Sequence, residues 1–234
     1  MFYPYQGYAQ IAVWFKPGSG GVLKYECRMF KCRSSLKRSM LSQDIGEEIK
    51  APDKGVWGRI RDVFRKPRVF IISDLHLDHT NIIKYCKRPF SNAAAMNRAL
   101  VSNWNNTIRN KDTVYYLGDL AFGRGSRSTD FWIKRLNGRI FFIKGNHDKS
   151  DKIKFHDNHI LEHKGHRIFL IHDPEQVPKD WDGWVIHGHL HNNKCVLGKC
   201  PFIDRKKKRI NVSVELTGYR PVDMDELIKE IELS

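Results

Sequence analysis

Short apolar runs alternate with amphipathic stretches from Arg68 to the end of this 234-residue chain. A strand covered on both faces shows a continuous apolar run without polar alternation, so these runs predict buried strands. Two short runs flanking the Lys164-Gly165 turn predict a hairpin. The expected strands are Val69–Ile72, 113–117, 140–143, 160–162, 167–171, 184–186 and 210–214.

Helices are predicted between and after these strands. Met96, Leu100, Trp104 and Ile108 recur every four residues, which is the spacing of an apolar stripe on one helix face, and Ser91 is the expected N-cap. A short helix is expected over 130–136 and an acidic amphipathic helix over 223–233. Strands alternating with helices indicate an α/β domain over residues 68–234.

The first 67 residues have a different pattern. They hold more Lys and Arg than Asp and Glu, several prolines and a Gly-Ser-Gly-Gly turn. Strand-like runs cover only 8–15 and 22–25, and one amphipathic stretch lies around 56–64. We therefore expect a basic, partly ordered N-terminal extension over residues 1–67. Its aromatic residues are expected to pack it onto the domain, although aromatic residues among basic ones also suit single-stranded nucleic acid.

Charge indicates what kind of partner to expect. Lys and Arg number 41 against 26 Asp and Glu, which gives a net charge of +15 at pH 7. Such an excess favours a polyanionic partner, nucleic acid first and a membrane surface second, and the alternative is a solubilising surface. The basic run at 205–209 is expected at a hairpin tip, where it could touch a phosphate backbone or simply be solvated.

The sequence also bears on the compartment. No apolar run approaches the roughly 20 residues of a membrane span, and residues 1–10 lack the basic and apolar regions of a secretory signal. Five cysteines are an odd number, which favours thiols in a reducing compartment over a disulfide framework. We expect a cytoplasmic protein without a membrane partner. Pairs spaced by four residues leave a structural zinc site open as an alternative, with Cys27, Cys32, Cys195 and Cys200 as its ligands.

Polar residues that can bind metals follow the buried strands. In open α/β sheets, ligands bind beyond the carboxyl ends of the strands, so residues far apart in sequence can meet there. Carboxylate, imidazole and amide ligands together suit divalent transition metals such as Mn²⁺, Fe²⁺ or Zn²⁺. The residues at the expected strand ends are Asp74, Asp119, Asn146, His172 and the stretch 187–191.

These residues stand in motifs that resemble the signature of calcineurin-like metallophosphoesterases. That signature runs DxH, GD, GNH[DE], H and GHxH, and every element occurs in this order between residues 68 and 222. The corresponding residues here are Asp74-Leu75-His76, Gly118-Asp119, Gly145-Asn146-His147-Asp148, His172 and Gly188-His189-Leu190-His191. The flanking Arg88-Pro89-Phe90 and Ile210-Asn211-Val212 segments also resemble small bacterial and phage members of the family. The resemblance implies an α/β/β/α sandwich of four layers built on two mixed β-sheets.

The resemblance also implies roles for these residues. Two divalent metal ions are expected, Mn²⁺ first, with Fe²⁺, Zn²⁺ or Ni²⁺ as alternatives. His147 resembles the general acid of the family and Asp148 the orienter of its imidazole, while Asn146 and Arg124 are candidates for binding the substrate. His79 and His187 either line the site or only bond the backbone. One metal would be held by Asp74, His76, Asp119 and His191, and the other by Asp119, Asn146, His172 and His189, with Asp119 bridging.

The implied activity is hydrolysis of a phosphoester by a bridging hydroxide between the two metals. A phosphodiesterase, acting on nucleic acid or nucleotides, is favoured because the acid candidate His147 is present and the chain is basic. A phosphomonoesterase acting on nucleotides or phosphoproteins remains the alternative. A non-catalytic scaffold is less favoured, since no ligand position is lost. The sequence leaves the oligomeric state open.

Overall fold

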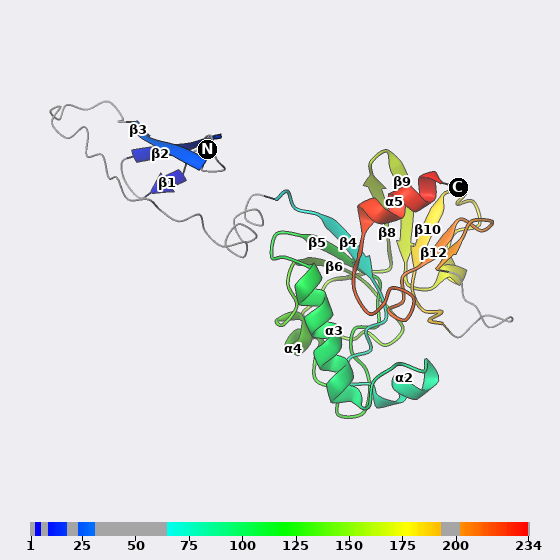
Figure 1. Ribbon diagram of the computed structural model, residues 1–234. Coiled ribbons are helices and arrows are strands. Elements are labelled where there is room, and N and C mark those ends of the chain that lie inside the picture. Colours follow the sequence, from blue (N-terminus) through cyan, green and yellow to red (C-terminus); the bar gives the residue numbers. More distant parts are fainter. Residues whose placement is uncertain (1–2, 6–8, 18–22, 31–64, 193–201, 234) are drawn as a thin grey trace. The chain divides into compact units, whose positions relative to one another are not determined.

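A computed structural model describes residues 3–5, 9–17, 23–30, 65–192 and 202–233. The chain divides into two compact units, residues 1–65 and 66–234 (Figure 1). In the first unit, β1 (Tyr3–Tyr5), β2 (Ala9–Pro17) and β3 (Leu23–Phe30) form an antiparallel sheet in that order. Strands were expected at 8–15 and 22–25, so both signals are confirmed with shifted ends. The stretch 56–64 lies outside the described residues.

The second unit holds two five-stranded mixed sheets. In the first sheet, β4, β5, β6 and β7 run parallel, and β13 pairs antiparallel with β4. Its order is β13 (Val222–Asp223), β4 (Val69–Ile72), β5 (Thr113–Tyr116), β6 (Arg139–Ile143) and β7 (Phe155–His156).

The second sheet combines a parallel centre with antiparallel edges. β9, β10 and β12 run parallel, β8 forms the predicted hairpin with β9, and β11 pairs antiparallel with β12. The order is β11 (Ile203–Asp204), β12 (Arg209–Asn211), β10 (Trp184–His187), β9 (His166–Ile171) and β8 (Asn158–His163).

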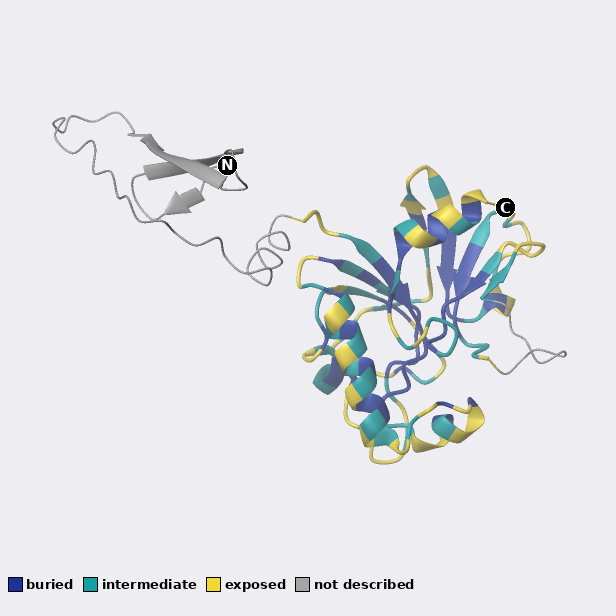
Figure 2. Ribbon diagram, viewed as in Figure 1, coloured by how far each residue is buried: buried dark blue, intermediate teal, exposed yellow. Residues whose placement is uncertain are grey.

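Two apolar cores hold these elements together. Helix α3 (Ala93–Thr107) and the short α4 (Thr129–Ile133) cover one face of the first sheet, where Trp104 packs against β5 (Figure 1). The second core lies where the sheets face each other and includes Ile71 and Ile186. Helix α5 (Met224–Glu232) adds its buried stripe to this core. In Figure 2 the central strands are buried mainly toward their carboxyl ends, whereas the helices expose one side.

The α/β class with two mixed sheets is therefore confirmed. The outer face of the second sheet, at Phe169 and Val185, packs against Val177 and Trp181, in the segment that contains the 3-10 helix η1 (Pro174–Gln176). The complete four-layer order stays a prediction. Across the described residues, every helix is too short or too polar to cross a bilayer.

Several element ends differ from the sequence expectations. The side chain of Asn92, not Ser91, caps α3 by accepting a hydrogen bond from the Ala95 amide at 2.9 Å. Helix α4 is capped by Ser128 and ends at Ile133, and β12 ends at Asn211 rather than at residue 214. The short α2 (Thr80–Tyr85) has no counterpart among the predicted helices.

Candidate metal centre

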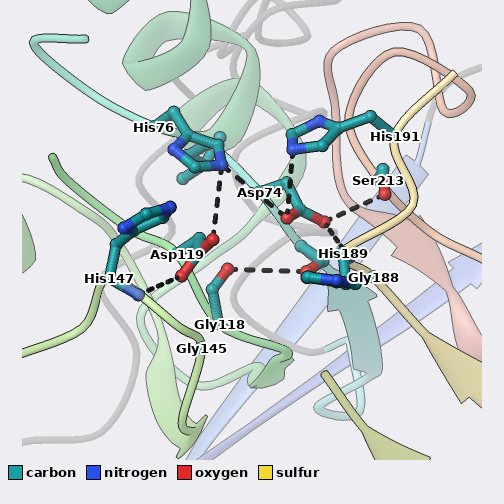
Figure 3. Close-up of polar contacts among 12 residues, drawn as sticks. Asp74, His76, Gly118, Asp119, Gly145, His147, Gly188, His189, His191 and Ser213 are labelled. Atoms are coloured by element: carbon teal, nitrogen blue, oxygen red, sulfur yellow. Dashed lines mark hydrogen bonds and ion pairs between the residues drawn. The ribbon is translucent and has the colours of Figure 1, made fainter. Parts of the chain in front are cut away.

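The motifs leave the strands at one common edge of the two sheets. Asp74 follows β4, Asp119 follows β5, and His172 follows β9 directly. The 145–148 loop follows β6 and the 188–191 loop follows β10. β4, β5 and β6 run parallel in the first sheet, and β9 and β10 run parallel in the second. Their carboxyl ends therefore deliver the motif residues to one place (Figure 3).

An unusual backbone conformation turns the side chains inward. Asp74, His76, Asp119, His189 and His191 all have positive φ, between 48° and 66°. This left-handed region costs a non-glycine residue about 1–2 kcal/mol. Hydrogen bonds between the loops hold it: the Asp74 amide donates to the Gly118 carbonyl and the His76 amide to the Asp119 carbonyl, each at 3.0 Å. Such strain is typical of a functional site.

Glycines let the loops approach each other. A Cβ at Gly145 would overlap the carboxylate of Asp119, and one at Gly188 would overlap the carboxylate of Asp74 and the Ser73 hydroxyl. The two motif glycines are therefore required by space, because any side chain there would push a carboxylate out of the cluster.

Asp74 uses one carboxylate oxygen for support and leaves the other open. It is fully buried. Its Oδ2 accepts hydrogen bonds from the His189 amide at 3.0 Å and the Ser213 hydroxyl at 2.9 Å. Its Oδ1 lies 3.8 Å from His76 Nε2 and 3.6 Å from His191 Nε2. The open oxygen thus faces two imidazole nitrogens across gaps longer than hydrogen bonds.

Asp119 is arranged in the same way. Its Oδ1 accepts a hydrogen bond from the His147 amide at 2.9 Å. Its Oδ2 lies 3.5 Å from His76 Nε2 and 3.5 Å from His172 Nε2, so it stands between two imidazoles. His172 donates from Nδ1 to the Leu117 carbonyl at 2.7 Å, which leaves Nε2 as an acceptor.

Buried atoms without hydrogen-bond partners test whether a cation fits here. Four such atoms belong to the cluster: Asp74 Oδ1, His76 Nδ1, His76 Nε2 and His172 Nε2. A buried polar atom without a partner is costly, and a cation would satisfy the electron pairs of Asp74 Oδ1, His172 Nε2 and the unprotonated nitrogen of His76. Oxygen and imidazole nitrogen are also the ligand types that divalent transition metals take. The residues present therefore fit a metal centre.

Two groups of possible ligand residues include Asp74, and within each group the ligand atoms lie within 4.8 Å of one another. One is Asp74, His76 and His191, and the other is Asp74, Asp119 and His172. These groups share Asp74, whereas the resemblance implied Asp119 as the shared ligand. Asp119 Oδ2 nevertheless lies equally far from His76 and His172, as a bridging oxygen would.

The electrostatics favour the ligating forms of two central residues. Burial alone would raise the pKa of Asp74, but the imidazoles of His191, His172 and His76 outweigh it and hold that pKa below its ordinary value. Burial lowers the pKa of His76 well below 6.5, despite the nearby Asp74 charge. Asp74 is therefore an anion and His76 a neutral imidazole at pH 7. Burial, with the charge of Asp74, raises the pKa of Asp119, and a cation between the carboxylates would relieve that repulsion.

Asn146 and His189 lie beside this cluster. Asn146 Nδ2 is 3.2 Å from His189 Nδ1, and the His189 and His172 rings are 5.1 Å apart between centroids. His189 therefore stands next to His172, and Asn146 lines the same small pocket as His172. His189 does not belong to the two groups of atoms around Asp74.

His147 and Asp148 occupy different places in the loop. The His147 ring stacks on Phe122, with 3.9 Å between centroids and 31° between planes, and lies 5.7 Å from the His76 ring. Asp148 was expected to orient this imidazole. Instead, its buried carboxylate accepts hydrogen bonds from the amides of Asp119, Leu120 and Gly145, at 2.7, 3.0 and 2.9 Å. Asp148 thus ties together the two loops that carry Asp119 and His147.

Glu215 and Arg88 were not predicted as parts of the site. Glu215 Oε1 lies 3.1 Å from His191 Nδ1, and the Arg88 guanidinium donates to the same oxygen, with Nε at 2.9 Å. Arg88 also donates to the carbonyls of Asp74 and Leu75, each at 2.8 Å. These buried contacts orient His191 and fix the Asp74 loop. The Arg88-Pro89-Phe90 segment offered a signal through its family likeness, but Glu215 stands in no motif.

Glu215 also belongs to a third group of possible ligand atoms, with Cys86 and His191. The Arg88 cation lies 2.7 Å from Glu215, so a second cation there would be repelled. Burial would lower the pKa of His191, but Asp74, Cys86 and Glu215 together raise it to about 11 when no metal is bound.

The remaining candidates are more distant from the centre. Arg124 is exposed in the loop after Phe122, and no described polar contact joins it to the cluster. His79 packs its ring 5.0 Å from Phe122, beside the site. His187 is buried with Nδ1 2.9 Å from the Gly188 carbonyl, and burial lowers its pKa to about 4. Of the proposed zinc ligands, Cys32, Cys195, Cys200 and the Cys27 side chain lie outside the described part of the chain.

Known proteins resemble this chain in sequence. Residues 68–199 match the calcineurin-like phosphoesterase superfamily domain. An uncharacterized protein of Methanocaldococcus jannaschii is 47% identical over 167 residues, which cover 70% of this chain and 92% of the relative.

Solved structures give a similar result. A protein of unknown function from Aquifex aeolicus has a TM-score of 0.56 and 26% identity, and the match covers 70% of this chain and 99% of that one. A Vps29 single mutant from Entamoeba histolytica aligns with a TM-score of 0.33 and 21% identity over 61% of this chain and 72% of that one, too low to carry an argument. The motif order and the family match agree, and the chain belongs to the calcineurin-like phosphoesterase superfamily.

Proposed function

We propose that this protein is a metal-dependent phosphodiesterase with two divalent metal ions, Mn²⁺ first. The observation that carries the proposal is the pair of buried carboxylates, Asp74 and Asp119, which turn their open oxygens toward the imidazole nitrogens of His76, His172 and His191. The family supplies the reaction class, hydrolysis of a phosphoester. A reducing, cytoplasmic setting is part of the same proposal.

Each metal would have its own set of residues. Asp74, His76 and His191 would hold one, and His172, Asn146 and His189 the other, with Asp119 serving both. Two bound divalent cations would neutralise the charge of the phosphoryl group and lower the pKa of the attacking water. Hydrogen bonds to the atoms that do not bind metal would keep the ligands oriented. These bonds join Asp74 Oδ2 to Ser213, His191 Nδ1 to Glu215 and His172 Nδ1 to the Leu117 carbonyl.

His147 would protonate the leaving oxygen. Its amide is tied to Asp119 Oδ1 and its ring rests on Phe122, so the imidazole is held at the rim of the centre. An alkoxide is a poor leaving group and needs a proton, which favours the diester reading. A phosphomonoesterase would use the same ligands, so an assay must distinguish this alternative from a phosphodiesterase.

The test is a paired assay of the full chain with Mn²⁺. Bis-p-nitrophenyl phosphate reports diesterase activity and p-nitrophenyl phosphate reports monoesterase activity. Faster hydrolysis of the diester supports the proposal, and hydrolysis of the monoester alone overturns the diester reading. If the protein binds two metal ions but hydrolyses neither substrate, the proposal that it is an enzyme is overturned. Asp74→Ala is the control for contaminating enzymes and should be inactive.

His147→Ala separates the acid from the ligands. We expect unchanged metal content and a rate about 10²–10⁴-fold lower on diesters with alkyl leaving groups, because the proton donor is lost. The loss should be much smaller with nitrophenolate, which leaves without a proton. An equal loss on both substrates would contradict the general-acid role, and loss of metal would indicate a structural one.

A further inference from the structure

One groove opens at His147, and a second groove shares a residue with it. The first, with a volume of about 380 Å³, runs between the 121–130 loop and residues 147–152. The second, of about 590 Å³, lies between α3 and α4. Arg127 lines both. A chain-like ligand bound at the metal centre could therefore extend along the first groove and past Arg127 into the second.

The second groove is lined by three arginines, and among the described residues only Arg127 has a carboxylate partner, Asp78, which is not part of the groove lining. Arg98, Arg127 and Arg135 line it, together with Asn97, Asn105 and other uncharged residues, and no carboxylate is among its lining residues. The first groove is more balanced, because Lys149 and Lys152 stand there with Asp130 and Asp151. Guanidinium and amide donors without carboxylates favour an anionic ligand, phosphate above all.

Two of the three cations of the second groove are held in place before any ligand binds. The Arg127 amide and Nε donate to Asp78 at 3.0 and 3.1 Å, and its guanidinium lies 4.3 Å from the Trp132 ring centroid. Arg135 donates to the Phe131 carbonyl at 2.7 Å and lies 3.5 Å above that ring. Prior ordering lowers the entropy cost of binding, so these guanidiniums are better suited to a ligand than freely moving side chains.

An aromatic surface lies where the first groove meets the metal centre. Phe122 is 38% exposed although it packs against His147 and His79. An exposed ring beside a row of cations is the combination that binds unpaired bases, because every base can stack and every nucleotide adds one phosphate. A base on Phe122 would sit next to the imidazole that protonates the leaving oxygen.

The basic run at 205–209 fits this role less well. Arg205 lies 3.0 Å from Glu230, Arg209 lies 3.4 Å from Glu175, and Lys208 Nζ donates to the Asp182 carbonyl at 2.7 Å. Both arginines are thus paired with carboxylates. The run also belongs to the turn between β11 and β12, in the other sheet from the one that α3 and α4 cover.

We propose that the two grooves hold a single-stranded nucleic acid segment, with a base on Phe122, backbone phosphates at Arg98 and Arg135, and the scissile phosphate at the Asp74–Asp119 centre. This inference rests on the proposed phosphodiesterase function and names its substrate class.

Binding is tested first, with the full chain in EDTA so that the strand is not cut. The probe is a fluorescent oligothymidylate of about 12 nucleotides. Arg98→Ala/Arg135→Ala is compared with Lys206→Ala/Lys207→Ala, which removes the same charge from the 205–209 run. We expect about tenfold weaker binding for the groove variant and a salt slope smaller by about 1.4. Arg98→Glu, an exposed change in α3, should weaken binding at least as much if the double variant folds poorly.

Cleavage in Mn²⁺ then separates the two proposals. In the groove variants, kcat/KM should fall about tenfold for the oligonucleotide and stay within about twofold for bis-p-nitrophenyl phosphate. The N-terminal extension is present in every variant, so its contribution cancels. Equal binding by groove and control variants, or a larger loss in the control, overturns the strand path. If the wild-type protein cuts bis-p-nitrophenyl phosphate but not the oligonucleotide, only the proposal of a nucleic acid substrate is overturned. If it cuts neither, the proposed phosphodiesterase function is overturned.

Discussion

Four ligand candidates each have one polar atom engaged and one open. Asp74 and Asp119 each anchor one oxygen by hydrogen bonds and turn the other toward imidazoles. His172 and His191 each engage Nδ1 and turn Nε2 toward a carboxylate oxygen, although His191, with its pKa raised to about 11, must lose the Nε2 proton when a metal binds. A donor atom whose partner atom is anchored cannot rotate away, so the protein fixes the direction of its electron pair before a metal binds.

Glu215 tests this view because, of the ligand candidates, the described contacts join it only to His191, and its other partner is the supporting Arg88. In Glu215→Gln the amide can accept from Arg88 but no longer compensates its charge, and it polarises His191 less. We expect Mn²⁺ affinity to fall about 10–100-fold and the free energy of unfolding to drop by about 3 kcal/mol. Metal titration and urea unfolding measure the two effects.

The matched control is Glu175→Gln, which removes an exposed carboxylate 3.4 Å from Arg209. It should leave metal affinity unchanged and cost less than about 1 kcal/mol. Metal affinity that survives in Glu215→Gln would mean that His191 is held by its other contacts.

The residue types of the centre could be predicted from sequence, but their supports could not. Motif order identifies Asp74, Asp119 and His172 because few other structures place these types after successive strands. Glu215 and Ser213 reach the centre only because the chain returns to it after β12. Asp148 shows the same limit, since its spacing suggests a partner for His147 whereas its oxygens bind three backbone amides.

At the scale of elements, long apolar signals were predicted well and short ones were missed. The strands β4 to β6 and the β8–β9 hairpin were found because each buries a run of apolar side chains. The two-residue strands β7, β11 and β13 exist only by pairing with a neighbour, so no local pattern marks them. Helix α2 has a single buried residue, Ile82, and therefore no apolar stripe to detect.

The N-terminus of α3 allows a test of the capping residue, because Ser91 was expected as the N-cap and the adjacent Asn92 is the observed one. Asn92 has an extended backbone and accepts from the Ala95 amide, which leaves Ser91 outside the helix. Asn92→Ala should lower the free energy of unfolding by about 1 kcal/mol, measured by urea denaturation. Ser91→Ala is the control and should change it by less than about 0.5 kcal/mol. A larger loss of stability in Ser91→Ala than in Asn92→Ala would instead identify Ser91 as the cap.

At the scale of the molecule, the fold separates support from chemistry. The core between the sheets is apolar and carries α5 on it, while both sheets send their carboxyl strand ends to the same edge. The net charge predicted a polyanionic partner from composition alone, yet composition could not tell which cations carry counter-ions. Arg98 and Arg135 of the second groove have no carboxylate partner among the described residues, whereas Arg205 and Arg209 do, and this difference depends on where the carboxylates fall after folding.

The contact between α5 and the second sheet predicts how stability depends on pH. Asp225, in the first turn of α5, lies 2.7 Å from both Lys164 Nζ and His163 Nε2 on the β8–β9 hairpin. The hydrogen bond from Lys164, then that from His163, lowers the pKa of Asp225 below its ordinary 3.8. A carboxyl with a lowered pKa stabilises the fold at pH values above the unfolded pKa. That contribution disappears as the pH falls through the folded pKa.

Asp225→Asn should therefore cost about 0.5–1 kcal/mol near pH 7, a modest figure because the side chain is 44% exposed and screened by water. The difference from wild type should shrink as the pH falls below 3.8 and through the lowered folded pKa, because Asp225 then loses its charge in the folded state as well. Urea unfolding in EDTA at a series of pH values measures it. Glu162→Gln, which removes a carboxylate 3.9 Å from Arg167 on the same hairpin, should show a smaller, flatter difference. A pH-independent cost in Asp225→Asn would mean that Asp225 acts through hydrogen bonding in the helix turn and not through its charge.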